Sequence, residues 1–174
     1  MIAAAVVAAI VLVVVLLLTS GGGGSKPRPT AVTRSAPVAA SEAQLRALPA
    51  TLGHPVYWVG PRPGNTYELT RFSDGGAWIR YLPSGVSVGA PNQTYVTVGS
   101  YPVADAYAAA QRGARRPGAT TASAAKGGLL VIPPEHPQSV YVAYPGAKVL
   151  IEVYSPSPAR SRKLASSTAL VPLP

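Results

Sequence analysis

The chain has 174 residues, a formal net charge of +9 and no cysteine. This length accommodates one domain beside an anchor and a linker, and the lack of cysteine excludes disulfide bonds and thiolate metal sites. The positive charge would attract anionic partners such as lipid head groups, acidic wall polymers or nucleic acid. Abundant Ala, Pro, Gly and Arg with little Lys also indicate a GC-rich genome, which is a non-functional origin for the arginines.

Residues 2–18 form an uninterrupted run of Ala, Val, Ile and Leu, and Thr19-Ser20 then leads into Gly21–Ser25. As a helix, the run would be about 25 Å long, against ~30 Å of bilayer hydrocarbon. A signal-peptide core is shorter, and no small-x-small cleavage pattern follows the run. A buried core helix would keep one polar face. We therefore predict a retained, single-pass transmembrane anchor at residues 1–18.

The orientation of the anchor depends on two conflicting observations. Lys26, Arg28 and Arg34 follow the apolar run, so the positive-inside rule would place the C-terminal domain in the cytoplasm. Long domains, however, cross the membrane largely regardless of charge, and the sequence after the run suits a tether through an envelope. We expect a cell-membrane protein whose C-terminal domain is extracytoplasmic.

Residues 19–41 predict a flexible linker, because Gly, Ser, Pro, Thr and Ala with scattered Arg do not support a packed core. One α+β domain is predicted over residues 42–174, and without the three linker charges its net charge is +6. Ser41 and Gln44 match a capping box. The pattern predicts a short helix that runs through Leu48 and stops at Pro49.

A meander of strands is predicted after this helix. Val56–Val59 is rich in β-forming residues, and Gly60–Asn65 is a turn cluster. Strands over 66–72 and 77–82 would be joined by a hairpin loop at Ser73–Gly76, and a fourth strand would cover 95–98.

The second half of the domain begins with the clearest helical pattern, Tyr101–Arg112. Pro102 suits its first turn, Asp105 its N-terminal dipole and Gly113 its end. Further elements are predicted as a loop over 114–128, strands over 129–132, 139–144 and 148–154, a Pro145-Gly146 turn, a helix from Ser157-Pro158 to Ala165, and an extended end over 171–174. In all, we expect a mostly antiparallel sheet of about six short strands and two or three short helices.

Candidate catalytic residues are few. The two histidines, His54 and His136, both lie beside prolines in predicted turns. Glu135 next to His136 is a conceivable acid/base pair, but adjacent residues of an extended loop point apart. Any carboxylate pair would come from Glu42, Glu68, Asp74, Asp105, Glu135 and Glu152. We interpret Asp74 and Asp105 as turn and helix residues, and Glu68 and Glu152 as solvent-facing strand residues.

Aromatic and basic residues alternate along the predicted meander. The set is Tyr57, Trp58, Arg62, Tyr67, Arg71, Phe72, Trp78, Arg80 and Tyr81. A sheet that displays such residues on one face can bind single-stranded nucleic acid or sugars. Strand alternation places Trp78 and Arg80 on one face and Ile79 and Tyr81 on the other, so some of these aromatics must fill the core.

Part of the domain resembles other proteins. The stretch Leu52–Pro61, continuing through Tyr67–Arg71, resembles a segment of uncharacterised membrane-anchored proteins of GC-rich actinobacteria. The resemblance covers about half of the domain. It implies an anchored architecture and a small exported domain, and it brings no activity or site residue with it.

We predict a non-catalytic envelope module that is held at the membrane by residues 1–18 and binds another envelope component. A small extracytoplasmic hydrolase using His54 or His136 is an alternative from a different class. Binding of an anionic polymer by the basic surface is a third hypothesis. No catalytic residue, cofactor or metal site is predicted, and nucleic acid is not favoured as a partner.

Overall fold

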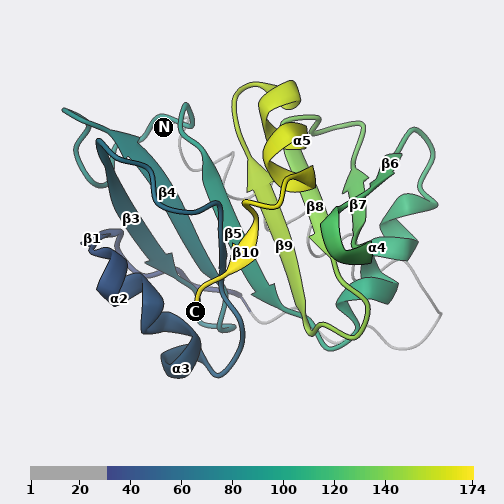
Figure 1. The fold of residues 1–174 in the computed structure, drawn as a ribbon, viewed down its shortest axis with the longest axis horizontal. Coiled ribbons are helices and arrows are strands. Elements are labelled where there is room, and N and C mark those ends of the chain that lie inside the picture. The colour runs from purple at the N-terminus through teal and green to yellow at the C-terminus, as the bar shows by residue number, and fades with distance from the viewer. Residues whose placement is uncertain (1–30) are drawn as a thin grey trace.

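A computed structural model describes residues 31–174 and shows an α+β fold built on a mostly antiparallel sheet. The predicted anchor at residues 1–18 and much of the predicted linker lie outside the described residues. Among the helices of residues 31–174, none is long and apolar enough to cross a membrane. The main sheet has eight strands in the order β1-β3-β4-β5-β9-β8-β7-β6 (Figure 1).

The elements have the following bounds. The strands of the main sheet are β1 Val38–Ala40, β3 Asn65–Arg71, β4 Ala77–Pro83, β5 Thr97–Pro102, β6 Thr120–Ser123, β7 Leu129–Ile132, β8 Ser139–Ala143 and β9 Val149–Tyr154. A separate two-stranded sheet pairs β2 Tyr57–Trp58 with β10 Val171–Pro172. The helices are α2 Glu42–Arg46, α3 Leu48–Leu52, α4 Ala106–Ala114 and α5 Pro158–Ser166, with a 3₁₀ turn η1 at Ala125–Gly127.

The two faces of the main sheet are covered differently. Face A carries Ile79, Val98 and Val153, and it packs against α2, α3, the β2–β10 pair and α5 (Figure 1). Face B carries Trp78 and Glu152, and its half formed by β7, β8 and β9 packs against α4. Among the described elements, no helix covers the half of face B formed by β3, β4 and β5. The candidate site lies on this uncovered half of face B.

The predicted strands at 66–72, 77–82, 129–132, 139–144 and 148–154 are confirmed within one residue at each end. The turn at Pro145-Gly146 is also confirmed, because Gly146 has φ +74° and the Ala147 N–H donates to the Tyr144 carbonyl. The sheet has more strands than predicted, because β1 lies in the predicted linker and β6 in the predicted loop over 114–128.

The capping box at Ser41 is confirmed, with reciprocal hydrogen bonds between Ser41 and Gln44. The prediction that Pro49 stops the helix is wrong. A second helix, α3, contains Pro49 in its first turn. Backbone N–H groups of the first turn have no intrahelical acceptor, so the N–H that proline lacks is not needed there. The helix ends at Gly53, whose φ of +74° is the left-handed conformation that glycine adopts readily.

The predicted helix over 101–112 starts too early. Tyr101 and Pro102 end β5, and α4 begins at Ala106 and continues past Gly113. Pairing with β9, in which Tyr101 lies opposite Leu150, extends the strand further than its local sequence indicates.

The folded domain also begins before the predicted boundary at residues 41–42. β1 pairs with β3, so that Val38 lies opposite Leu69, and the Thr33 N–H donates to Ser73 Oγ at 3.0 Å. Part of the predicted linker therefore lies along the sheet. Backbone hydrogen bonds at a sheet edge need no particular side chains, so composition does not reveal them.

Candidate binding site on the uncovered face

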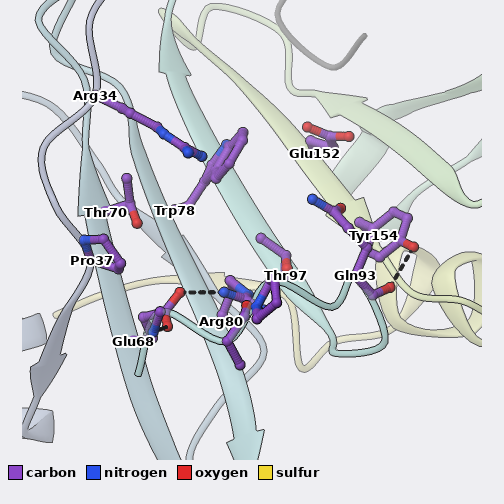
Figure 2. Close-up of a pocket in the computed structure, with 13 residues that line it drawn as sticks. Arg34, Pro37, Glu68, Thr70, Trp78, Arg80, Gln93, Thr97, Glu152 and Tyr154 are labelled. Carbon is purple, nitrogen blue, oxygen red and sulfur yellow. Dashed lines mark hydrogen bonds and ion pairs between the residues drawn. The ribbon is translucent and has the colours of Figure 1, made fainter. Parts of the chain in front are cut away.

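Face B holds a cavity of about 220 Å³ at the place where no helix covers it. Side chains of β3, β4, β5 and β9 form its floor, while Arg34, Pro37, residues 89–91 and Gln93 form its walls. Figure 2 shows Arg34, Pro37 and Gln93 around this floor. The volume equals roughly seven water molecules at about 30 Å³ each. The cavity therefore fits one small group, such as a single side chain or sugar ring.

The register of the strands assembles this floor from two rows of residues that cross the sheet. The first row consists of Thr70, Trp78, Gly99 and Glu152. The second row consists of Glu68, Arg80, Thr97 and Tyr154. Because alternate residues of a strand point to the same face, both rows lie on face B, and all of their residues except Gly99 line the cavity.

Glu152 is the centre of a buried hydrogen-bond network. Its carboxyl group accepts from Ser139 Oγ at 2.6 Å, from the Tyr101 hydroxyl at 2.7 Å and, at 3.5 Å, from the Tyr141 hydroxyl. Burial raises the pKa of Glu152, and the three hydroxyl donors oppose this shift. Burial also raises the pKa of Tyr101 and Tyr141, so both remain hydroxyl donors.

Gly99 makes this network possible. The Tyr101 ring lies over Gly99, and a Cβ atom at position 99 would be 2.8 Å from the Tyr101 hydroxyl oxygen. In this position the Tyr101 hydroxyl accepts from Trp78 Nε1 at 2.6 Å while it donates to Glu152. Because Gly99 has no side chain, Tyr101 of β5 can connect Trp78 on β4 with Glu152 on β9 through hydrogen bonds.

The second row fastens the loop between β4 and β5 to the sheet. Arg80 forms an ion pair with Glu68 at 2.6 Å and donates to the carbonyl oxygens of Ala90 and Asn92. Glu68, with 1% of its surface exposed, also accepts from the Gly89 N–H at 2.6 Å. The charges of Glu68 and Arg80 thus offset each other, and both side chains hold the wall of the cavity in place.

Two polar side chains at the rim have no such structural partner. Arg34 and Gln93 line the cavity, and neither side chain forms a hydrogen bond or ion pair within residues 31–174. Figure 2 shows Arg34 extending from the wall toward Trp78. Glu68 and Arg80 offset each other, and the buried Glu152 carboxyl group accepts from hydroxyl groups, so Arg34 is the lining cation without an ion pair among residues 31–174.

The two histidines lie away from this cavity. His54 packs at the hairpin loop, where its Nδ1 and Nε2 lie 2.9 Å from the carbonyl oxygens of Pro55 and Gly75. Glu135 pairs with Arg116 at 2.9 Å rather than with its neighbour His136. Within residues 31–174, neither histidine side chain forms a hydrogen bond or ion pair with a carboxylate or a serine hydroxyl. Within residues 31–174, no group of three His, Asp or Glu side chains could hold a metal ion.

The interpretation of Glu68 and Glu152 as solvent-facing residues is wrong, because both are buried, with 1% and 3% of their surface exposed. They are separated by β4 and β5, so three strand spacings put their backbones about 14 Å apart. Each carboxyl group has its own partners: Glu68 pairs with Arg80, and Glu152 accepts from Ser139 and Tyr101. These partners lie on neighbouring strands and were not recognisable from local sequence.

The aromatic residues of the meander are mainly core residues, as strand alternation predicted. Trp58 and Trp78 have 3% and 6% of their surface exposed. The Trp78 ring packs edge-on against Phe72 with 4.7 Å between centroids, while Trp58 contacts Tyr67 on face A. An exposed aromatic platform for nucleic acid is therefore not formed by these tryptophans.

No protein-family model matches the chain, and no curated protein or solved structure matches it either.

Proposed function

We propose that the chain is a non-catalytic binding module of the cell envelope, and that the cavity on face B receives an acidic group of another envelope component. The observation that carries the proposal is the position of Arg34. Its guanidinium points over a cavity whose other charges are offset or buried, and a carboxylate binds a guanidinium through two parallel hydrogen bonds. Gln93 and Thr70 offer further polar contacts at the same cavity.

The small volume favours recognition of one protruding group over enclosure of a whole ligand. Drug-sized ligands occupy pockets of about 300–1,000 Å³, which exceeds the cavity of about 220 Å³. A carboxylate-bearing side group of a peptide or glycan fits this size. The hydrolase alternative has less support, because the His54 ring contacts backbone carbonyl oxygens and neither histidine lines the cavity.

The two tryptophans allow a direct test. Trp78 lines the cavity while Trp58 lies on face A, so fluorotryptophan NMR of the full-length chain in nonionic detergent gives one reporter and one internal control. Glucuronate should shift the Trp78 signal saturably, whereas glucose, its neutral counterpart, should not. N-acetylglutamate and N-acetylglutamine form a second matched pair.

Arg34→Gln should abolish the shift, and Arg71→Gln should preserve it, because Arg71 is exposed and does not line the cavity. The proposal would be wrong if no carboxylate shifted Trp78, or if both variants responded alike.

The membrane location is a separate part of the proposal and rests on the apolar run at residues 2–18. The full-length protein should pellet with membranes and resist carbonate extraction. Protease added to intact cells or spheroplasts should remove the domain. Protection until lysis would instead support the cytoplasmic orientation that Lys26, Arg28 and Arg34 favour.

A further inference from the structure

A second cavity, of about 340 Å³, lies among the turn that follows β2, the segment before β5 and the first turn of α5. Its lining includes Arg62, Asn65, Tyr81, Thr94, Tyr95 and Arg160. None of the described residues that line it is an Asp or Glu. The cavity is therefore positively charged, and no lining carboxylate would repel an anion.

Neither arginine of this cavity forms an ion pair within residues 31–174. Within the described part of the chain, ion pairs are formed by Arg46, Arg80 and Arg116, but by neither Arg62 nor Arg160. The Nε atom of Arg62 is buried and has no hydrogen-bond acceptor. This N–H is too enclosed for a ligand to reach, whereas the terminal nitrogens of Arg62 are not buried and form no hydrogen bond within residues 31–174, so they are the donors available to an oxyanion.

We propose that Arg62 and Arg160 form a binding site for a phosphate ester. A guanidinium presents several N–H donors in one plane and binds phosphate through two of them, which a lysine cannot do. The Asn65 amide and the Thr94 hydroxyl line the same cavity and add neutral donors. Arg62 follows β2 and Arg160 lies in α5, so two separate segments of the chain would bind the same anion.

The remaining walls explain why an ester fits better than free phosphate. The lining also includes Tyr81, Tyr95, Val96 and three prolines, which add apolar surface beside the arginines. The Tyr95 ring also lies against Arg80, whose guanidinium carbon is 5.3 Å from the ring centroid. The cavity holds roughly eleven water volumes, which leaves room for an organic group beside the phosphate.

The test measures binding to the full-length chain in nonionic detergent by isothermal titration calorimetry. Three probes share the phosphate chemistry: inorganic phosphate, glycerol 3-phosphate, and phosphatidylglycerol added to the micelles. Saturable binding of glycerol 3-phosphate that is tighter than that of inorganic phosphate would support a soluble ester as ligand. Saturable binding of phosphatidylglycerol alone would support a lipid head group.

Arg160→Gln and Arg62→Gln should each weaken binding about tenfold, because each removes charge-assisted hydrogen bonds. Arg162→Gln is the matched control, since it removes the same charge from the same helix at a position outside the cavity. It should change affinity by less than about twofold. Arg160 is exposed, so its replacement tests the site even if Arg62→Gln disturbs the fold.

Absence of saturable binding by all three probes, or an equal loss with Arg162→Gln and Arg160→Gln, would overturn the proposal. Neither result bears on the acidic-group cavity, whose test depends on Arg34 and on the Trp78 signal.

Discussion

On face B, β7 and β9 present Val131 and Leu150 to α4, whereas β3 and β4 present Thr70, Trp78 and Arg80 to a cavity. The same sheet face is therefore stabilised in two ways. In the covered half, apolar side chains are removed from water by a helix. In the open half, hydrogen bonds and an ion pair connect the strands, so this half keeps its structure without a covering helix and leaves room for a ligand.

The largest expected effect is that of Trp78→Ala, which removes the aromatic ring from the floor of the open half. The free energy of unfolding of this variant should be lower than that of the wild type by ~3–5 kcal/mol. Urea unfolding of the full-length chain in detergent measures the difference. Leu150→Ala in the covered half is the control, with an expected loss of ~2–5 kcal/mol. A much smaller loss for Trp78→Ala would show that the open half contributes little to stability.

Gly99→Ala should destabilise the protein by ~1–3 kcal/mol, because the new methyl group collides with the Tyr101 ring. A double-mutant cycle with Tyr101→Ala tests whether this collision is the cause. In the Tyr101→Ala background, the added methyl group should have little effect, since the atoms that it meets are gone. A cost of equal size in both backgrounds would place the strain elsewhere.

Glu152→Gln should change how stability depends on pH. Because burial raises the pKa of Glu152 above its ordinary value near 4.5, the folded protein keeps a proton that the unfolded chain releases. Wild-type stability should therefore fall as the pH rises through this range. The glutamine of the variant does not titrate, but it offers one hydrogen-bond acceptor fewer to the hydroxyl donors. The Glu152→Gln variant should therefore be less stable than the wild type by ~1 kcal/mol near pH 4. This difference in stability should become smaller at higher pH. An equal gap at every pH would contradict the raised pKa.

The smallest effects are expected at the histidines, which belong to neither half of face B. His136→Ala should change stability by less than about 0.5 kcal/mol. His54→Ala should cost ~1 kcal/mol, because His54 contacts the carbonyl oxygen of Gly75 in the hairpin loop. Thermal unfolding of both variants is a sufficient measurement. A large loss at His136 would reveal a structural role that its contacts do not indicate.

The strands with strong alternation, such as 77–82 and 148–154, could be predicted from sequence because their apolar residues mark face A by themselves. β1, β6 and the end of β5 could not, because pairing with a neighbouring strand rather than local composition defines them. The candidate site could not be predicted from the sequence either. Glu68 and Glu152 have the spacing of solvent-facing strand residues, and their partners, Arg80 on β4 and Ser139 on β8, become neighbours only through the register of the sheet.

The pairing of β1 with β3 determines where the chain can be cut. With β1 in place, the sheet ends in a strand of three residues, Val38–Ala40, directly after Pro37. Short edge strands next to proline are poor templates for another chain. A fragment that begins at Ser41 would instead expose the seven-residue edge of β3, so it should self-associate, whereas a fragment that keeps the residues from Thr33 onward should stay monodisperse in light scattering.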